Sequence, residues 1–376
     1  MTNALKITVA GAGIGGLVAA IGLARQGHNV TVAEQAEAIT EVGAGIQISP
    51  NGMVVLKALG LEQTFENVSI RADAVRLIDG PTGREVLTLD LARDAPDLGW
   101  YFVHRARMID VLKEAAEAAG ATLETGRTVE PPPAGHALAD DDVLIGADGL
   151  KSRLRARVDE ASKPFFTKQV AWRALVPGTP EPVVEVHMGP GRHLVTYPLQ
   201  GGLRNTVAVE ERAGWADEGW SHEDHPANLR AAFQGFARPV RDWLEQVDQV
   251  HLWGLFRHRV ADRWYSGRQV VLGDAAHPTL PFLAQGANLA LEDAWVLTDK
   301  LSQKPLAEAL AAYQEVRKPR AIRVTEAATA NARNYHLSFP PVRFAAHSLL
   351  RLAGLLAPTQ PLKRFDWLYR HDVTRG

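Results

Sequence analysis

Apolar and polar positions at the start of the chain predict a strand, a helix and a second strand. Residues 5–10 are mostly apolar and β-branched, which is typical of a strand buried on both faces of a parallel sheet. Apolar residues then recur at helical spacing between Leu17 and Ala24, and Gly27 is placed to end that helix in the left-handed conformation. A second apolar strand covers residues 30–33. This order indicates a Rossmann-like α/β domain.

The middle of the chain predicts a second sheet. Residues 74–91 have the pattern of a hairpin whose turn is DGPTG at 79–83. Residues 183–209 and 250–260 supply further strands. We therefore expect a second domain with a mixed sheet beside the first.

Helical periodicity marks three later stretches. Residues 227–247 and 306–334 carry apolar residues at helical spacing, and we expect Pro319 to interrupt the second of these helices. Residues 344–357 are amphipathic and too short and too polar to span a bilayer, which takes about 20 apolar residues. We expect this last helix to pack on the rest of the protein or on a second copy of the chain, and not on a membrane.

The composition is that of a globular protein without thiol chemistry. The chain has 376 residues, 46% hydrophobic and 22% charged, which is enough for two domains. The absence of cysteine excludes disulfides, thiolate metal sites and cysteine nucleophiles, and the histidines show no metal-ligand spacing, so we expect no metal. A net charge of −2 with dispersed signs argues against nucleic-acid binding. No signal-peptide pattern begins the chain, so we expect a cytoplasmic protein.

Four residues of the N-terminal strand, helix and strand predict a dinucleotide-binding site. Gly11, Gly13 and Gly16 form a G-x-G-x-x-G motif between the first strand and its helix. The first glycine permits the tight turn, the second lets a pyrophosphate approach the backbone, and the third lets helix and strand pack closely. Glu34 follows the second strand, where its carboxylate can bind ribose hydroxyls and would repel a 2′-phosphate. The pattern indicates NAD or FAD and disfavours NADP at this site.

Two later strand ends favour FAD. Residues 141–155 contain a short strand, the loop GADG and a helix start that Ser152 can cap. The strand at 270–272 leads to Asp274, in the crevice where open α/β sheets bind their ligands. Asp274 can accept a hydrogen bond from a ribityl hydroxyl, while the amides of residues 286–288 can face the negative charge of a reduced flavin ring. An NAD dehydrogenase has no use for this second contact.

The three stretches GAGIGG, GADGLKSRLR and GDAAHPTLPFLAQGAN together resemble the flavoprotein aromatic hydroxylases, which are single-component FAD monooxygenases. The resemblance covers nearly the whole chain and is greatest to the branch of salicylate hydroxylase and 6-hydroxynicotinate monooxygenase. It implies an enzyme that uses FAD, NAD(P)H (with NADH favoured) and O2. The implied reaction hydroxylates a small, salicylate-like phenolic acid through a flavin hydroperoxide. Further segments that carry the resemblance are VGAGIQISPN (42–51), HRARMIDVL (104–112), WRALVP (172–177), RHLVTYPL (192–199), YQEVRKPRA (313–321) and WLYRHDV (367–373).

The resemblance also implies roles for individual residues. Glu34 would bind the adenosine ribose, Arg105 would contact the pyrophosphate region, and Asp274 would hold the ribityl chain. Gln47 and Ala287 would lie near the flavin ring. Asp148 would stabilise the loop that faces the cofactor and the nicotinamide. The complete set expected to bind the cofactor is Gly11, Gly13, Gly15, Gly16, Glu34, Gln47, Arg105, Thr128, Asp148, Asp274, Pro281, Gly286, Ala287 and Asn288.

The strand predicted at 192–199 carries the candidate catalytic pair. Strand alternation places His193, Val195 and Tyr197 on one face. The spacing of His193 and Tyr197 resembles the pair that relatives use to hold a phenolic or hydroxypyridine oxygen. Because a phenolate is a better nucleophile than a phenol, we expect His193 to take or hold the proton and Tyr197 to orient the oxygen. Arg173 and Arg192 are both candidates to bind a substrate carboxylate, and the sequence does not choose between them.

The motif positions predict a discontinuous FAD-binding domain. A C-terminal helical segment, residues 326–376, follows it. Residues 128–142 depart from the family pattern with three consecutive prolines, which we interpret as a trimmed surface hairpin; a damaged FAD edge is the alternative. The FAD-binding domain is expected at 1–70, 99–165 and 262–325, and the substrate-binding sheet domain at 71–98 and 166–261.

Three alternatives to a hydroxylase of a salicylate-like acid stay open at this point. The ring could be a hydroxypyridine or a polycycle, because a histidine and a tyrosine would serve either. The protein could also be a non-catalytic FAD-binding protein, although such a protein has no need of His193 or Tyr197. Apart from the aromatic substrate and O2, the only partner expected is a second copy of the chain, so the protein should be a monomer or a homodimer.

Overall fold

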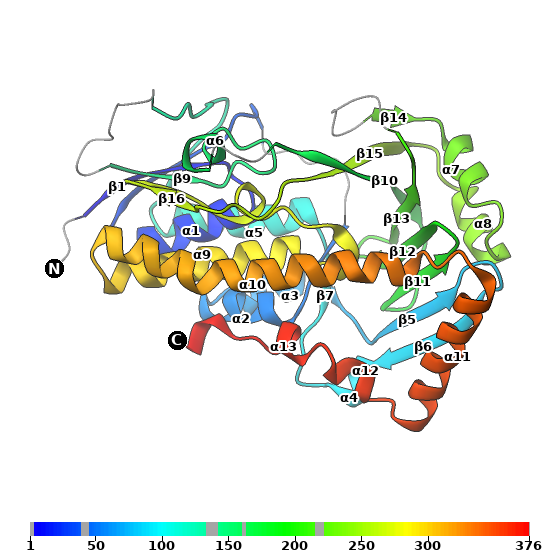
Figure 1. Cartoon of the computed structure of the whole chain (residues 1–376). Helices are drawn as coiled ribbons and strands as arrows, with labels where there is room; N and C mark the ends of the chain where they lie inside the picture. The colour runs from blue at the N-terminus through cyan, green and yellow to red at the C-terminus, as the bar shows by residue number, and fades with distance from the viewer. Residues whose placement is uncertain (1–3, 39–44, 133–141, 160–162, 215–221, 376) are drawn as a thin grey trace.

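Two large sheets and one small sheet organise the protein (Figure 1). The computed structural model describes residues 4–38, 45–132, 142–159, 163–214 and 222–375. The first large sheet has six strands in the order β16-β17-β9-β1-β2-β8, and all neighbours pair in parallel except β16 and β17. Its strands are β1 (Lys6–Ala10), β2 (Asn29–Ala33), β8 (Thr122–Glu124), β9 (Asp142–Gly146), β16 (Tyr265–Ser266) and β17 (Gln269–Val271).

The strand, helix and strand expected at the N-terminus are confirmed. Ile7 and Val9 of β1 are fully buried, and α1 (Ile14–Arg25) packs against α5 (Arg105–Ala118) and α9 (Gly286–Gln303). Because α1 has neighbours on several sides, its residues are buried nearly all round. Gly27 follows the helix with a φ of +85°, as expected for a glycine that ends a helix.

The second large sheet is the mixed sheet expected from the middle of the chain. Its order is β14-β15-β10-β13-β12-β11-β5-β6, and only β11 and β5 pair in parallel. The hairpin predicted at 74–91 is β5 and β6. The strands are β5 (Ala74–Asp79), β6 (Arg84–Asp90), β10 (Phe165–Pro177), β11 (Val183–Gly189), β12 (Arg192–Leu199), β13 (Leu203–Glu211), β14 (His222–Asp224) and β15 (Val250–Arg257).

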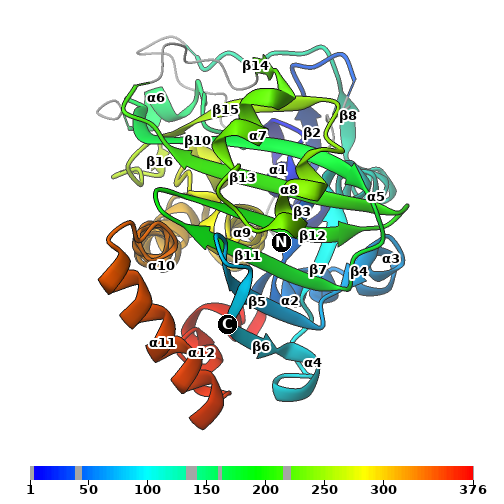
Figure 2. The same cartoon turned by 90° about the vertical axis from the view of Figure 1, so that its right-hand side faces the viewer.

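The two faces of this sheet have different neighbours. Trp172 and Leu194 point to the face covered by α7 (Pro226–Ala232) and α8 (Arg238–Leu244), which lie in front of the sheet in Figure 2. Val209 points to the opposite face, where it packs with Leu280 and Phe282 from the segment that precedes α9. Strand alternation therefore separates a covered face from a face that looks toward the first sheet.

A three-stranded sheet, β3-β7-β4, connects the two large ones. The backbone amide of Gly45 in β3 donates a hydrogen bond to the Asn205 side chain of β13 at 2.9 Å. The strands are β3 (Gly45–Ile48), β4 (Ser69–Arg71) and β7 (Tyr101–His104). Among the short helices, α2 (Pro50–Ala58) follows β3 and α3 (Glu62–Asn67) contacts β4, whereas α4 (Leu91–Asp94) contacts β5 and β6, and α6 (Arg155–Val158) contacts β16 and β17.

Two helical expectations are wrong. The helix expected at 227–247 is two helices, α7 and α8, because Gly235 weakens the helix and Pro239 starts a new one near its N-terminus. Helix α10 (Leu306–Tyr335) runs without interruption through Pro319. Buried ion pairs of Arg317 and Arg320, on either side of the proline, hold that turn to the neighbouring helix.

The chain after α10 is mostly helical, and the longest helix of this part buries a histidine while it exposes several leucines. In α11 (Pro340–Leu356), buried His347 lies 3.4 Å from Asp79, whereas Leu349 and Leu355 are exposed. No helix within the described ranges is long and apolar enough to cross a membrane. The remaining elements are η1 (Gly273–Ala275), η2 (Pro281–Leu283), α12 (Gln360–Lys363), α13 (Asp366–Tyr369) and η3 (Val373–Arg375).

The division into domain ranges stays a prediction, and the strands of the two large sheets can be placed within those ranges. Those of the six-stranded sheet lie within 1–70, 99–165 and 262–325, and those of the eight-stranded sheet within 71–98 and 166–261, with β10 beginning one position earlier. Residues 128–132 have neither helix nor strand, and most of the hairpin expected at 128–142 lies outside the described residues.

Candidate active site

The carboxyl ends of β1, β2 and β9 meet at a cavity of about 640 Å³. Such an edge of a parallel sheet is where α/β proteins bind their ligands. The residues predicted for a dinucleotide that line this cavity are Gly11, Gly13, Glu34, Arg105, Thr128 and Asp148.

The glycines of the first motif have separate structural roles. Gly11 has a φ of +104°, and a Cβ there would lie 2.5 Å from the Ala147 carbonyl oxygen. A Cβ on Gly16 would overlap the Gly11 carbonyl oxygen, and one on Gly15 would lie 2.6 Å from Leu272 Cδ1. Gly15 and Gly16 therefore serve helix packing. Gly13, by contrast, has no atom within 4 Å of the place of a Cβ, so its backbone is open to a ligand.

Glu34 fastens the glycine-rich turn. Its carboxylate accepts hydrogen bonds from the amides of Ala12 at 2.9 Å and Ala36 at 3.0 Å. A carboxylate has about four acceptor positions, so two remain for ribose hydroxyls at the cavity wall.

Basic side chains gather around this cavity, and sequence reasoning identified only Arg105 among them. Arg127, Lys151 and Arg153 also line it. Asp148 accepts a hydrogen bond from the Arg153 amide at 2.9 Å, and thereby shapes the loop after β9. The signal for Lys151 and Arg153 was the basic run KSRLR at 151–155, which sequence reasoning assigned only to a helix start, whereas Arg127 lies outside that run. Their positive charge suits a pyrophosphate.

A second cavity of about 210 Å³ lies between β3, the eight-stranded sheet and the start of α9. Strand β12 contributes His193, Val195 and Tyr197, so the predicted alternation is confirmed. The segment between β17 and α9, together with the first turn of α9, supplies the opposite wall. The predicted site residues that line this cavity are Gln47, His193, Tyr197, Asp274, Pro281, Gly286 and Ala287.

Asp274 lines the second cavity, and Arg105 of the first cavity is near enough to act on its charge. Its carboxylate is exposed toward the second cavity, and no described residue donates a hydrogen bond to it. Burial within the protein raises the pKa of this carboxyl, while His277 and Arg105 act in the opposite direction. An acid that is costly to ionise and lacks a donor suits a ligand that carries hydroxyl groups.

Tyr197 and His193 line the β12 side of the cavity. Phe102 stacks on Tyr197 with ring centroids 5.1 Å apart, and burial raises the pKa of the phenol, so Tyr197 stays a hydrogen-bond donor. His193 is buried, and its Nδ1 lies 2.6 Å from Nε2 of His336. This contact leaves Nε2 of His193 for a ligand. No sequence pattern pointed to His336, which lies just after α10.

The choice between the two arginines is decided by tertiary structure. Arg173 lines the second cavity, with its guanidinium 4.4 Å from the Trp253 ring centroid. Arg192 instead donates a hydrogen bond to the Ala232 carbonyl and pairs with Glu210 at 3.3 Å. Only Arg173 is in a position to meet a ligand in the cavity.

Asn288 lines neither cavity. Its side chain accepts a hydrogen bond from the Ser49 amide at 3.0 Å, and donates to the Gln47 carbonyl at 3.2 Å and to the Ala284 carbonyl at 2.7 Å. These contacts tie β3 to the first turn of α9. The loop before this helix carries strain, because Ala284 has a φ of +53°.

A buried ionic cluster beneath the site was not foreseen. Glu292 and Asp293 of α9 and Arg317 of α10 are fully buried. Arg317 lies 2.6 Å from Glu292 and 2.7 Å from Asp293, and Arg320 also binds Glu292. Asp293 accepts a hydrogen bond from the Gly273 amide at 2.9 Å and pairs with His277. The cluster therefore fixes the loop that carries Asp274.

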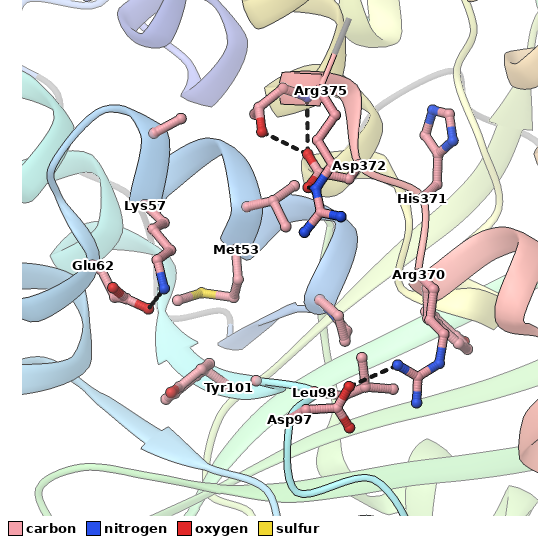
Figure 3. A pocket seen from close by; sticks show the side chains of 16 residues that line it. Met53, Lys57, Glu62, Asp97, Leu98, Tyr101, Arg370, His371, Asp372 and Arg375 are labelled. Atoms are coloured by element: carbon pink, nitrogen blue, oxygen red, sulfur yellow. Dashed lines mark hydrogen bonds and ion pairs between the residues drawn. The ribbon is translucent and has the colours of Figure 1, made fainter.

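A further cavity, about 670 Å³, lies elsewhere, between α2 and the C-terminal segment (Figure 3). Its charged side chains pair with one another: Lys57 with Glu62, Arg370 with Asp97, and Arg375 with Asp372. None of the predicted site residues lines it. Within the described ranges, no group of three histidine or carboxylate side chains is placed to hold a metal.

The residues of the two adjoining cavities fit FAD. The open backbone at Gly13 and the cations beside it suit the pyrophosphate, and Asp274 offers an unpaired carboxylate to a ribityl chain. The start of α9, at Gly286 and Ala287, presents amides to the flat, electron-rich end of the cofactor. Fold and site thus define a flavin-binding α/β protein with an aromatic-sized cavity.

Comparison with known proteins agrees with this definition. The model of the family described as "FAD binding domain" matches residues 4–137 and 139–328, so the chain belongs to that family. It is 34% identical to 3-amino-4-hydroxybenzoate 2-monooxygenase PtmB3 of Streptomyces platensis, over 99% of this chain and 97% of that one. It is 32% identical to the salicylate hydroxylase of Pseudomonas putida, over 98% and 93% of the two chains.

Two further matches extend the comparison. The 6-hydroxynicotinate 3-monooxygenase of Bordetella bronchiseptica is 32% identical over 85% of this chain and 89% of its own. The structure of Klebsiella pneumoniae HpxO with FAD and uric acid superposes with a TM-score of 0.81 at 26% identity, over 94% of each chain. The expected resemblance is confirmed, and the protein is an FAD-dependent aromatic-ring monooxygenase.

Proposed function

We propose that the protein uses NAD(P)H and O2 to hydroxylate a small phenolic aromatic acid. The observation that carries this proposal is the meeting of His193, Tyr197 and Arg173 in one cavity of about 210 Å³. This volume is below the roughly 300–1,000 Å³ of pockets for drug-sized ligands, which favours a single ring over a polycycle. The matched enzymes act, by their names, on an aminohydroxybenzoate, a salicylate and a hydroxynicotinate.

The side chains would divide the work on such a substrate. Arg173 would bind the carboxylate through charge-assisted hydrogen bonds, which fixes the ring in the cavity. Tyr197 would donate to the phenolic oxygen, and Nε2 of His193 would accept its proton, which makes the ring a better nucleophile. Leu280 and Pro281 would keep water away from the reacting atoms.

The cofactor would be held by the residues of both cavities. We propose that Glu34 binds the adenosine ribose, that Arg105 and its neighbouring cations bind the pyrophosphate, and that Asp274 holds the ribityl chain. When bound, FAD supplies the chemistry that no side chain offers: it accepts electrons from NAD(P)H, with NADH favoured, and activates O2 as the flavin hydroperoxide that the family resemblance implies.

The direct test is NADH oxidation by the FAD-loaded protein with salicylate, other hydroxybenzoates, aminohydroxybenzoates and 6-hydroxynicotinate, with products identified by mass spectrometry. We expect at least one of these acids to stimulate oxidation and to gain one oxygen atom. Stimulation by 6-hydroxynicotinate alone would replace the phenol by a hydroxypyridine. Bound FAD without stimulation by any of them would contradict the proposal.

A further inference from the structure

Two further titratable side chains, those of His336 and Glu211, form a hydrogen-bonded chain from His193 in the cavity toward the surface. His193 Nδ1 lies 2.6 Å from His336 Nε2, and His336 Nδ1 lies 2.8 Å from Glu211 Oε1. Both histidines are buried, whereas the side chain of Glu211 is 51% exposed. The three groups therefore form an unbroken hydrogen-bonded path from the second cavity to the surface.

The geometry points to a proton relay in which His336 and Glu211 carry the phenolic proton of the substrate from His193 to solvent. The inference deepens the proposed function and rests on it, because the relay needs a phenol at Nε2 of His193. His336 and Glu211 touch neither substrate nor cofactor in this scheme. They are positioning residues that act through His193.

One arrangement of protons satisfies every contact before the transfer. The Glu211 carboxylate accepts from Nδ1–H of His336, Nε2 of His336 accepts from Nδ1–H of His193, and Nε2 of His193 is then the acceptor that faces the phenol. When the phenol gives its proton to that nitrogen, each histidine gains one proton and passes one on. The last proton reaches Glu211 and then water, and the tautomers are restored when a proton returns along the same path.

His193 needs such a path because it holds a proton poorly. Burial, and then the neighbouring His336, lower the pKa of His193 well below its usual value. Burial also lowers the pKa of His336, but the hydrogen bond and charge of Glu211 act in the opposite direction. A base with so low a pKa cannot store the proton, but it can transfer it at once to the next acceptor.

The surroundings favour transfer in this direction. The rings of Phe282 and Tyr335 flank His193 at 5.2 and 5.3 Å, and within the described part of the chain His336 is the residue that shares a hydrogen bond with it. The positive charge of Arg192 also lowers the pKa of His336. Glu211 opens into a surface groove of about 510 Å³, where a proton can pass to water or buffer. The charged groups of the groove, besides Glu211, are Lys168, Arg212, Arg257 and Arg333.

The test follows the proton directly in FAD-loaded protein. The probe is 3-hydroxy-4-nitrobenzoate, an aromatic acid whose phenol and phenolate forms differ in colour. Stopped-flow mixing in weak buffer with a pH indicator gives the rate of ionisation and the rate of proton release. We expect Glu211→Gln and His336→Phe to slow proton release at least tenfold, while the dissociation constant of the probe changes less than threefold.

Glu210→Gln is the matched control, because this neighbouring acid pairs with Arg192 at 3.3 Å and Arg212 at 2.9 Å and is not part of the path. It should release the proton at the wild-type rate. Added imidazole should restore the rate in His336→Ala, an effect that a purely structural role of His336 would not produce. Should His336→Phe fail to fold, the half-exposed Glu211→Gln still decides the matter.

The outcomes separate the relay from the proposed function. Probe that binds and ionises equally fast in Glu211→Gln and wild type overturns the relay alone. A probe that does not bind in competition with the best substrate overturns the proposed site, and the relay with it. Slower release in Glu211→Gln but not in Glu210→Gln supports both.

Discussion

At the scale of single residues, the site combines side chains that are costly to the protein alone. The carboxylate of Asp274 has no donor among the described residues, and burial raises its pKa. Arg173 reaches the same cavity beside Val195 and Val207, with its guanidinium over the Trp253 ring. An acid like Asp274 is typical of binding sites, where a ligand supplies the hydrogen-bond donor that the fold does not.

Asp274→Asn should separate cofactor affinity from stability. Because the raised pKa means that the folded protein disfavours the ionised acid, the neutral amide should raise the Tm of the FAD-free protein. Loss of hydrogen bonds to a charged group, about 1.5–3 kcal/mol, should weaken FAD binding roughly 10- to 100-fold. Flavin fluorescence titration and calorimetry measure the two effects. The exposed Asp110→Asn is the control, and equal FAD affinity in both variants would remove the ribityl assignment.

Arg173→Met should affect only substrates that carry a carboxylate. Removing one charge-assisted contact should raise their KM about 10- to 100-fold. The KM of a phenol without the carboxylate should stay within about threefold. Arg76→Met, which removes an arginine paired with Glu181 outside both cavities, controls for the loss of a cation. An equal rise in KM for both kinds of substrate would show that Arg173 shapes the cavity and does not bind the acid.

At the scale of elements, buried ion pairs join α9 to α10 in addition to apolar contacts. Arg317 holds Glu292 and Asp293 at hydrogen-bond distance, with no exposure to solvent. Because Asp293 also binds the Gly273 amide, the same contacts that join the helices set the position of the Asp274 loop. The pairs of Arg317 and Arg320 with Glu292 also hold the turns on either side of Pro319 to α9.

Arg317→Met should destabilise the protein by about 3–5 kcal/mol, because it leaves two buried carboxylates without their main partner. Arg323→Met on the same helix is the control, since Arg323 is exposed and stacks on Trp367 at 3.8 Å. Its cost should stay below about 1 kcal/mol. Urea unfolding measures both, and equal costs would contradict the view that the cluster holds the helices together.

At the scale of the whole molecule, the cluster predicts how stability depends on pH. Burial alone would raise the pKa of Asp293, but His277 and Arg317 outweigh it and lower the value to about 2. A depressed acid stabilises the fold above its unfolded pKa near 3.8 and loses this effect as pH falls through the folded value. The loss should be about 2 kcal/mol between pH 4 and pH 2.

Urea unfolding at several pH values checks this expectation. Glu292, whose pKa is also lowered, should add to the loss in the same pH range. An Asp293→Asn variant should be less stable than wild type at pH 7, and its stability should change less between pH 4 and pH 2. The same pH dependence in variant and wild type would show that other carboxylates dominate acid unfolding.

The sequence was sufficient for the features that depend on near neighbours. The first strand, helix and strand, the hairpin at 74–91 and the common face of His193, Val195 and Tyr197 follow from periods of 3.6 and 2 along the chain. The motif glycines and acids could be predicted as well, because a turn that admits a phosphate requires particular residues at particular spacings.

Only the tertiary structure decided which distant residues meet. It placed Arg173 and not Arg192 in the cavity, brought His336 to His193, and paired Arg317 with Glu292 and Asp293. It also kept α10 helical through Pro319. The physical reason is that a local pattern reports the conformational preference of a segment, whereas a contact or an ion pair depends on packing between segments far apart in the chain.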